Sequence, residues 1–197
     1  MSISTEDITA VILAGGQGRR MGGQDKGLLE FNGAPLIEQL IAELARQSVA
    51  TVINANRNLD RYRAFGLPVI QDRLADYQGP LAGFASAMES VATDYILTLP
   101  CDGPVVAADY VERFIAAQRQ SGAPICVAYD GQRLQPVHAL VRVDLRGSLD
   151  RFLDRGERKI DRWYALNDYA RSDFSDCVDM FRNINTPSDR QALQAEI

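Results

Sequence analysis

Short apolar runs alternate along the chain with segments whose apolar residues have helical spacing. The apolar runs predict strands at 10–13, 50–55, 67–72, 95–100 and 123–129. Helical spacing predicts a helix that begins near Pro35, a buried helix over 79–92, and a later helix with Val111, Phe114 and Ile115 facing inward. Because strands that alternate with helices form parallel βαβ units, the order predicts an α/β fold with a Rossmann-like, doubly wound, mostly parallel sheet.

The C-terminal third of the chain has a different pattern. Residues 138–143 predict an antiparallel edge strand, 151–163 a basic helical segment, and 183–185 a last strand before a helix capped by Thr186 or Ser188. No linker, internal repeat or low-complexity tract interrupts the sequence, so a single domain over 1–197 is expected. In such sheets, ligands bind beyond the carboxyl ends of the strands.

Composition narrows the classes of function. The net charge of -5 argues against nucleic acid or an anionic membrane as the main partner, since both select basic surfaces. One histidine and three separated cysteines suggest neither a zinc knuckle nor a disulfide framework. There is no apolar run of the roughly 18 residues that a spanning helix needs and no signal-peptide pattern, so a cytoplasmic protein is expected. Nothing in the sequence suggests an obligate interface, so a monomer is expected.

The stretch Val11–Gly27, VILAGGQGRRMGGQDKG, holds six glycines and three cations directly after the first predicted strand. It lacks the Gly-Lys pair of a Walker loop, and Met21 stands where the dinucleotide fingerprint needs its third glycine. Glycine backbone amides with Arg19 and Lys26 can nevertheless surround a polyphosphate. The position after a buried strand favours this phosphate-loop interpretation over a flexible turn with solvated cations.

The same stretch resembles the N-terminal signature of the molybdenum cofactor guanylyltransferases. GPLAG at 79–83, LPCD at 99–102 and NINTPSD at 183–189 are similar to three further motifs of that family, in the same order. The resemblance implies a nucleotide-diphospho-sugar transferase-like fold. It also implies transfer of GMP from GTP to the terminal phosphate of molybdopterin, with release of pyrophosphate. The N-terminal part would then bind GTP and the C-terminal part molybdopterin.

The resemblance assigns roles to individual residues. Lys26, Arg19 and Asp102 are expected to act in catalysis, with Asp102 as the ligand of Mg²⁺, or of Mn²⁺ as an alternative. The residues expected to bind GTP are Leu13, Ala14, Gly15, Lys26, Asn54, Asp72 and Asp102. Those expected on the molybdopterin side are Gly79, Gly83, Arg158, Asn183 and Asn185.

Some of these residues also have a purely structural explanation. Asn54 and Asp102, taken alone, are also typical of turns and helix caps, the glycines of GPLAG of helix–sheet packing, and Arg158 of an exposed basic segment. Cys101 is interpreted as structural, and His138 receives no role. The signature glycine Gly16 favours guanine.

Three other functions are alternatives to guanylyl transfer. A transferase of the same fold that uses CTP or a sugar phosphate is the nearest alternative, and a non-catalytic nucleotide carrier is the next. A dehydrogenase is excluded by Met21 and by the absence of an acid after the second strand. Beyond GTP and molybdopterin, other proteins of cofactor synthesis or of molybdoenzyme maturation are the expected partners.

Overall fold

The computed structural model describes residues 2–16, 23–74, 78–184, 186, 188–189 and 191–192. In this part of the chain, seven strands form one sheet in the order β5-β4-β1-β6-β8-β7-β9. The strands of this sheet are β1 (Ile8–Leu13), β4 (Ala50–Asn54), β5 (Val69–Ile70), β6 (Tyr95–Pro100), β7 (Ile125–Tyr129), β8 (Leu134–Arg142) and β9 (Tyr169–Asp173). A small hairpin, β2 (Glu30–Phe31) and β3 (Ala34–Pro35), stands apart from it.

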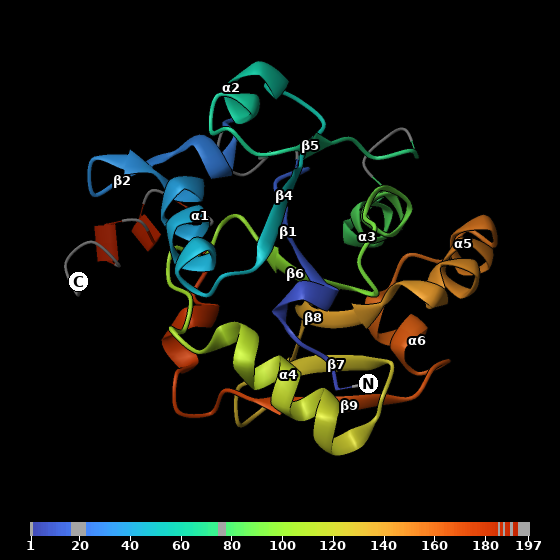
Figure 1. The fold of residues 1–197 in the computed structure, drawn as a ribbon. Helices are drawn as coiled ribbons and strands as arrows, with labels where there is room; N and C mark the ends of the chain where they lie inside the picture. Colours follow the sequence, from blue (N-terminus) through green and yellow to red (C-terminus); the bar gives the residue numbers. More distant parts are fainter. Residues whose placement is uncertain are drawn as a thin grey trace.

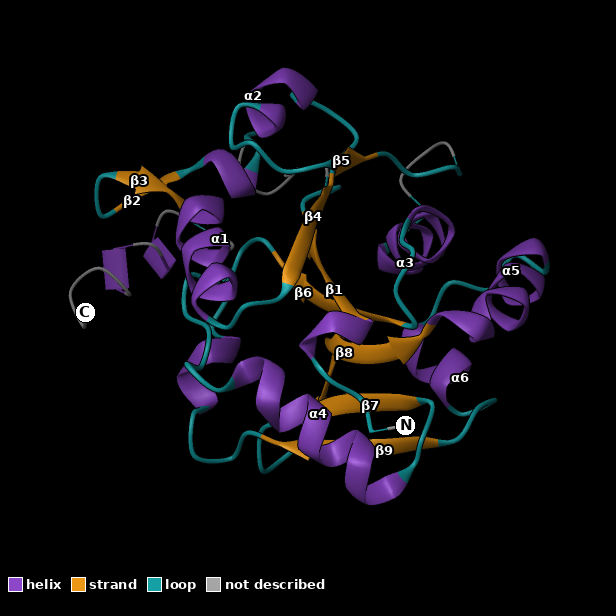
Figure 2. Cartoon of the chain, viewed as in Figure 1, coloured by secondary structure: helices purple, strands orange, loops and turns teal. Residues whose placement is uncertain are grey.

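Helices cover both faces of the sheet (Figures 1 and 2). The α-helices are α1 (Leu36–Arg46), α2 (Leu59–Arg63), α3 (Pro80–Ser90), α4 (Tyr110–Ser121), α5 (Arg146–Asp154) and α6 (Ile160–Tyr164). Short 3₁₀ turns lie at Thr5–Asp7, Lys26–Leu28, Val143–Leu145 and Val178–Phe181. Among the described residues, no helix is long and apolar enough to cross a membrane.

Two apolar cores lie on opposite faces of the sheet. On one face, Ile12 packs with the buried side chains of α1 and α4, among them Leu40 and Phe114. On the other face, the neighbouring Val11 packs with α3, α5 and α6 through residues such as Phe84. This alternation along β1 follows from the two-residue period of a strand, and it explains why the predicted strand was apolar throughout.

The predicted α/β class and its mostly parallel sheet are confirmed. The strand expected near 138–143 is antiparallel, as predicted, but it is β8, which lies inside the sheet between β6 and β7. Its direction follows from the tight turn after β7, in which the Asp130 carboxylate accepts the backbone N–H groups of Gln132 and Arg133. The edge place is taken by β9, whose polar sequence YARSD gave no strand signal and which pairs in parallel with β7.

Two local predictions in the C-terminal third need correction. The basic helical segment is two helices, because Gly156 has a left-handed backbone (φ 79°) between α5 and α6. Asn183 and Ile184 form no strand in the part of the chain that the structure describes. Thr186 does cap the residues that follow it: its hydroxyl accepts the Asp189 N–H at 3.2 Å, and the Asp189 carboxylate accepts the Thr186 N–H at 2.8 Å.

Candidate active site

Three parallel strands end together and define the edge at which the predicted site residues lie. Leu13, the last residue of β1, is in register with Asn54 of β4 and with Pro100 of β6. The chain leaves this edge through Ala14, whose N–H donates to the Asn54 carbonyl at 2.8 Å, and through Cys101, whose N–H donates to the Leu13 carbonyl at 3.1 Å. Parallel pairing therefore brings the ends of three distant segments to one place.

A clamp of two asparagines holds Asp72 at this edge. The side-chain amide of Asn54 donates to one carboxylate oxygen at 2.9 Å, and that of Asn56 donates to the other at 2.7 Å. The Asp72 N–H in turn donates to Asn56 Oδ1 at 2.8 Å. Asn54 is buried and Asp72 is half-buried, and the two amide hydrogen bonds fix the orientation of the carboxylate.

Two glycines are required by the closeness of this clamp to its neighbours. A Cβ on Gly15 would lie 2.9 Å from Asn56 Nδ2, and a Cβ on Gly83 would lie 2.6 Å from Asn54 Oδ1 and 2.8 Å from Leu13 Cδ2. Since real Cβ atoms do not approach side chains so closely, Gly15 lets the loop pass the clamp and Gly83 lets α3 pack on β1 and β4. The structure thus gives Gly83 a packing role against the clamp.

Lys26 and Asp102 form an ion pair across the same edge. Lys26 Nζ donates to Asp102 Oδ2 at 2.9 Å, and the side chains are 21% and 17% exposed, respectively. The other carboxylate oxygen, Oδ1, is buried and has no hydrogen-bond partner among the residues that the structure describes. A buried carboxylate oxygen without a partner fits a divalent metal ligand, because Mg²⁺ commonly takes one or two protein carboxylates and completes its shell with phosphate oxygens and water. Within the described ranges, no group of three or more acidic, histidine or cysteine residues gathers that could hold a metal alone.

Neither Cys101 nor His138 can serve as a proton-transfer group here. Burial raises the pKa of the Cys101 thiol far above its usual range, so it stays protonated. Burial lowers the pKa of His138 to about 3, and its ring lies against Tyr110, whose hydroxyl is 3.1 Å from Nδ1, and against Phe181. Both residues are parts of the core, as expected for Cys101.

Residues 10–170 match the family model described as the MobA-like NTP transferase domain. The chain belongs to this family. A relative from Shewanella loihica, named molybdenum cofactor guanylyltransferase, is 50% identical over 190 residues, which are 96% of this chain and 97% of the relative. The recognition drawn from the four sequence motifs is confirmed.

Solved structures support the fold of this MobA-like transferase. The molybdopterin-guanine dinucleotide biosynthesis protein A from Archaeoglobus fulgidus has a TM-score of 0.78 at 21% identity, with 96% of this chain and 97% of that chain covered. A protein from Mycobacterium tuberculosis, solved in complex with manganese, has a TM-score of 0.72 at 17% identity, with 96% and 99% covered. The expected nucleotidyltransferase fold is therefore confirmed.

The residues that were predicted for the second substrate are spread around the MobA-like site. The Ile184 N–H donates to the Asp102 carbonyl at 2.8 Å, and Asn183 lies beside Gly103, the residue that follows Asp102. Arg158 lies elsewhere: its guanidinium donates to Gln78 Oε1 at 2.8 Å, just before Gly79, and to two backbone carbonyls. Gly79 precedes α3 and has a left-handed backbone (φ 86°).

Two predicted residues, Arg19 and Asn185, lie outside the described residues, so their roles stay predictions. Conversely, Asn56 contacts Asp72 at this edge although the sequence did not predict it as a site residue. Its signal in the sequence is the pair Asn54-x-Asn56 at the end of the second strand. The comparison with the dinucleotide fingerprint uses this pair only to show that the required acid is absent. The same spacing places two amides around one carboxylate.

Proposed function

We propose that the protein transfers GMP from GTP to the terminal phosphate of molybdopterin and releases pyrophosphate. The observation that carries the proposal is the Asp102 side chain, with one oxygen on Lys26 and the other buried without a partner in the described part of the chain. This arrangement stands where three parallel strands end, on a chain that is 50% identical to a relative named molybdenum cofactor guanylyltransferase.

The reaction makes few demands for proton transfer. The acceptor is a phosphate monoester, whose second pKa is about 6, so its attacking oxygen is largely ionised at neutral pH. A bond forms between this oxygen and the α-phosphorus of GTP, while the bond from that phosphorus to the bridging oxygen breaks and its electron pair leaves with pyrophosphate. The lack of a usable histidine or cysteine at the described site is consistent with this chemistry.

Positioning and charge stabilisation are then the tasks of the site. Lys26 contacts the GTP phosphates and stabilises the negative charge that develops as pyrophosphate leaves. Asp102 keeps Lys26 extended toward the carboxyl end of β6 through their 2.9 Å ion pair. Asp102 Oδ1 would hold a divalent ion, which would supply further neutralisation of the phosphate charge; Mg²⁺ is the ion we propose, and Mn²⁺ the alternative.

The clamped Asp72 gives the preference for guanine. Each carboxylate oxygen can accept more than one hydrogen bond, so Asp72 can accept from the adjacent N1–H and N2–H groups of guanine while the two asparagines hold it. Cytosine offers an N3 acceptor beside its N4 donor, and a carboxylate facing that acceptor would be repelled. This complementarity favours GTP over the CTP-specific alternative.

The acceptor side is proposed to include Asn183 and, with it, Asn185, since Asn183 adjoins the segment that carries Asp102. Gly79, Gly83 and Arg158 stay predictions for this side. We likewise propose that the N-terminal part binds GTP and the C-terminal part molybdopterin. The cytoplasmic location, the monomeric state and contacts with other maturation proteins also stay predictions.

A direct experiment tests the proposal. The protein is incubated with molybdenum-loaded molybdopterin, Mg²⁺ and each of the four NTPs in turn, and pyrophosphate release is followed. We expect release with GTP that depends on molybdopterin. Release with CTP but not with GTP would contradict the guanine assignment, and nucleotide binding without release would favour the carrier hypothesis.

A further inference from the structure

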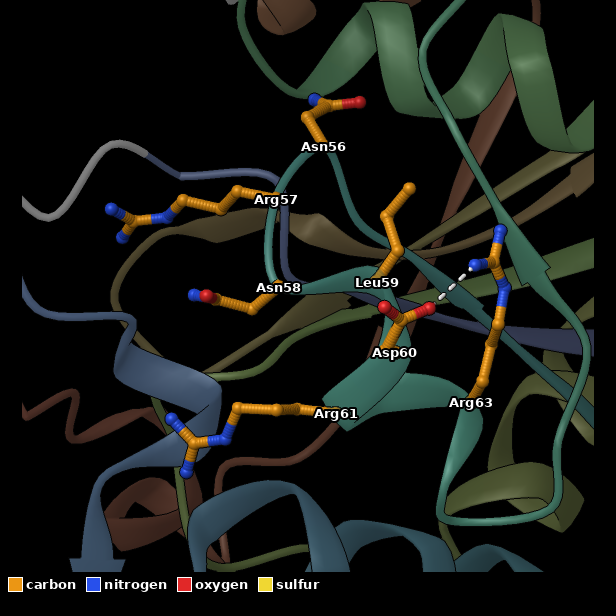
Figure 3. Close-up of a pocket in the computed structure, with 7 residues that line it drawn as sticks. All are labelled: Asn56, Arg57, Asn58, Leu59, Asp60, Arg61 and Arg63. Carbon is orange, nitrogen blue, oxygen red and sulfur yellow. Dashed lines mark hydrogen bonds and ion pairs between the residues drawn. The ribbon is translucent and has the colours of Figure 1, made fainter.

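The segment that leads into Lys26 is tied to the loop after β4 by one arginine. The two terminal nitrogens of Arg57 donate to the Gly23 carbonyl at 2.7 Å and to the Gln24 carbonyl at 2.9 Å. Its Nε lies 3.5 Å from Asp25 Oδ2, so the guanidinium meets three consecutive residues. Figure 3 shows Arg57 and Asn58 extending to the same side of this loop, while Asn56 points away from them.

Asp25 is the centre of this contact. Its side chain is only 5% exposed, and its carboxylate accepts hydrogen bonds from the Tyr62 hydroxyl and, at 3.0 Å, from the Asn58 amide. Burial, together with the nearby Cys101 and Asp25, raises the pKa of Tyr62 far above its usual range, so the hydroxyl stays protonated and donates. A buried carboxylate needs such partners and a counter-charge, and Arg57 supplies the charge.

The residue after Lys26 is held as closely as the one before it. A Cβ on Gly27 would lie 2.7 Å from the Tyr62 hydroxyl and 3.4 Å from Cys101, the neighbour of Asp102 in the chain. Asp25 and Gly27 are thus both fixed against Tyr62. Lys26 is set between them at the start of a 3₁₀ turn and reaches Asp102.

The same short loop also fixes the proposed base-binding carboxylate. Asn54 and Asn56 hold Asp72, while Arg57 and Asn58 hold Gly23–Asp25. Five consecutive residues, 54–58, therefore set the positions of Asp72 and of Lys26 in one frame. Asn58 adopts a left-handed backbone (φ 51°), a conformation that asparagine tolerates better than most residues and that turns the chain from one task to the other.

We propose that Arg57 is a positioning residue for the transfer reaction, with Asp25 as its buried counter-charge. It fixes Lys26 relative to Asp72, so that the phosphates are held at a set distance from the recognised base. This inference rests on the proposed function. Because rates fall steeply when a catalytic group is misplaced by about 1 Å, loss of Arg57 lowers kcat more than it weakens GTP binding.

The chain offers a matched control in Arg61. Arg57, Arg61 and Arg63 line one surface hollow of about 540 Å³, in which Arg63 pairs with Asp60 (Figure 3). The Arg61 guanidinium makes no hydrogen bond or ion pair within the described residues, and the side chain is exposed. Arg61 also lines a second hollow beside Gly23–Asp25, but Arg61→Ala removes the same charge without breaking a hydrogen bond or ion pair to that segment among the described contacts.

The kinetic test compares five variants in the pyrophosphate-release assay: Arg57→Ala, Arg57→Lys, Arg61→Ala, Lys26→Ala, and Lys26→Ala combined with Arg57→Ala. Arg57→Ala should lower kcat by roughly 10- to 100-fold and change KM for GTP by less than about threefold. Arg57→Lys keeps the charge but loses the planar fork, and should recover part of the loss. Arg61→Ala should stay within about twofold of the wild type. In a Lys26→Ala background, Arg57→Ala should lower kcat further by less than about threefold, because Arg57 acts by positioning Lys26.

Two kinetic results would overturn the proposal. One is an Arg57→Ala rate equal to that of Arg61→Ala. The other is the same fold loss from Arg57→Ala with and without Lys26, which would mean a general structural role.

Hydrogen exchange separates failure of this inference from failure of the proposed function. The Leu28 and Leu29 N–H groups donate to the Asp25 and Lys26 carbonyls, so their exchange reports on the tethered turn without any substrate. Faster exchange in Arg57→Ala, but not in Arg61→Ala, supports the tether even if the wild-type protein releases no pyrophosphate from GTP. Unchanged exchange in Arg57→Ala overturns the positioning role of Arg57. If Arg57→Ala speeds the exchange but the wild type is inactive with GTP, only the proposed reaction is overturned.

Discussion

Lys26 Nζ and Asp102 Oδ2 lie 2.9 Å apart, although 76 positions separate the two residues in the chain. The contact exists because β1 and β6 are parallel neighbours whose carboxyl ends coincide at Leu13 and Pro100. The charge of each residue is thus set against the other in the absence of substrate. Substitution of either residue removes this ion pair, which makes both residues sensitive points.

Replacing Asp102 by asparagine should remove the proposed metal ligand and keep the shape of the side chain. We expect turnover to fall on the order of 10²-fold or more, because an amide oxygen is a far weaker ligand for Mg²⁺ than a carboxylate. The measurement is pyrophosphate release over an Mg²⁺ titration, with thermal unfolding to show that the fold persists. Wild-type activity with an unchanged metal dependence would remove Asp102 from the site.

Lys26→Ala should cost on the order of 10²-fold or more in kcat, the scale for losing one preorganised group that stabilises developing charge. Arg63→Ala is the control, since it removes a cation that pairs only with the exposed Asp60 among the described contacts. Single-turnover kinetics with saturating GTP would isolate the chemical step. A loss no larger than that of Arg63→Ala would refute the role of Lys26.

Asp72→Asn should weaken the discrimination of the base. Hydrogen bonds to charged groups contribute about 1.5–3 kcal/mol, so kcat/KM for GTP should fall roughly 10- to 100-fold. Inosine triphosphate, which lacks the 2-amino group, provides the readout: the wild type should prefer GTP to it, and the variant should show a much smaller preference. An unchanged ratio in the variant would mean that Asp72 does not contact the 2-amino group.

Gly83→Ala should destabilise the protein, because the new Cβ would lie 2.6 Å from Asn54 Oδ1 and 2.8 Å from Leu13 Cδ2. Overpacking of this kind costs roughly 1–3 kcal/mol. Gly147→Ala in α5 is the matched control: its Cβ would meet only Arg151 at 3.5 Å, and alanine in a helix is favoured over glycine by about 0.5–1 kcal/mol. Urea unfolding of both variants measures the difference, which should have opposite signs at the two positions.

His138 should make the folded protein less stable in acid. Burial lowers its pKa from 6.5 to about 3, so the unfolded chain takes up a proton that the folded protein excludes. Stability from this residue is fully present above about pH 6.5 and is lost as the pH falls toward 3, at up to about 1.4 kcal/mol per pH unit. The unfolding free energies of the wild type and of His138→Gln should therefore diverge in slope between pH 6 and pH 4. Parallel slopes would show that His138 is protonated in the folded state.

The sequence pattern predicted the features that depend on local order. Strand positions followed from apolar runs, and α1 and α4 from spacing, because each element buries a continuous face. The place of β8 and the existence of β9 did not follow, since strand order in a sheet depends on partners far away in the chain. The basic segment 151–163 was predicted as one helical segment from its charge and spacing, but the left-handed backbone at Gly156 separates α5 from α6.

The site shows the same division. Lys26, Asp72 and Asp102 are named through the resemblance of short motifs to a known family; the structure brings Lys26 and Asp102 together, and the roles of all three stay predictions. Arg57 could not be named in this way, since its value comes from the carbonyls of Gly23 and Gln24, and backbone acceptors leave no trace in a sequence. Asn56 is an intermediate case. Its place after the second strand can be read from the sequence, but its partner, Asp72, cannot.

The hydrogen bond from the Ile184 N–H to the Asp102 carbonyl has a consequence for synthesis on the ribosome. The segments that carry Leu13, Asn54, Asp72 and Asp102 emerge early and can assemble while translation continues. Asn183 lies in a segment that is translated after all of these. A transcript truncated ahead of Asn183 would therefore encode a chain that keeps the residues proposed to bind the nucleotide but lacks the segment that donates a hydrogen bond to the Asp102 carbonyl.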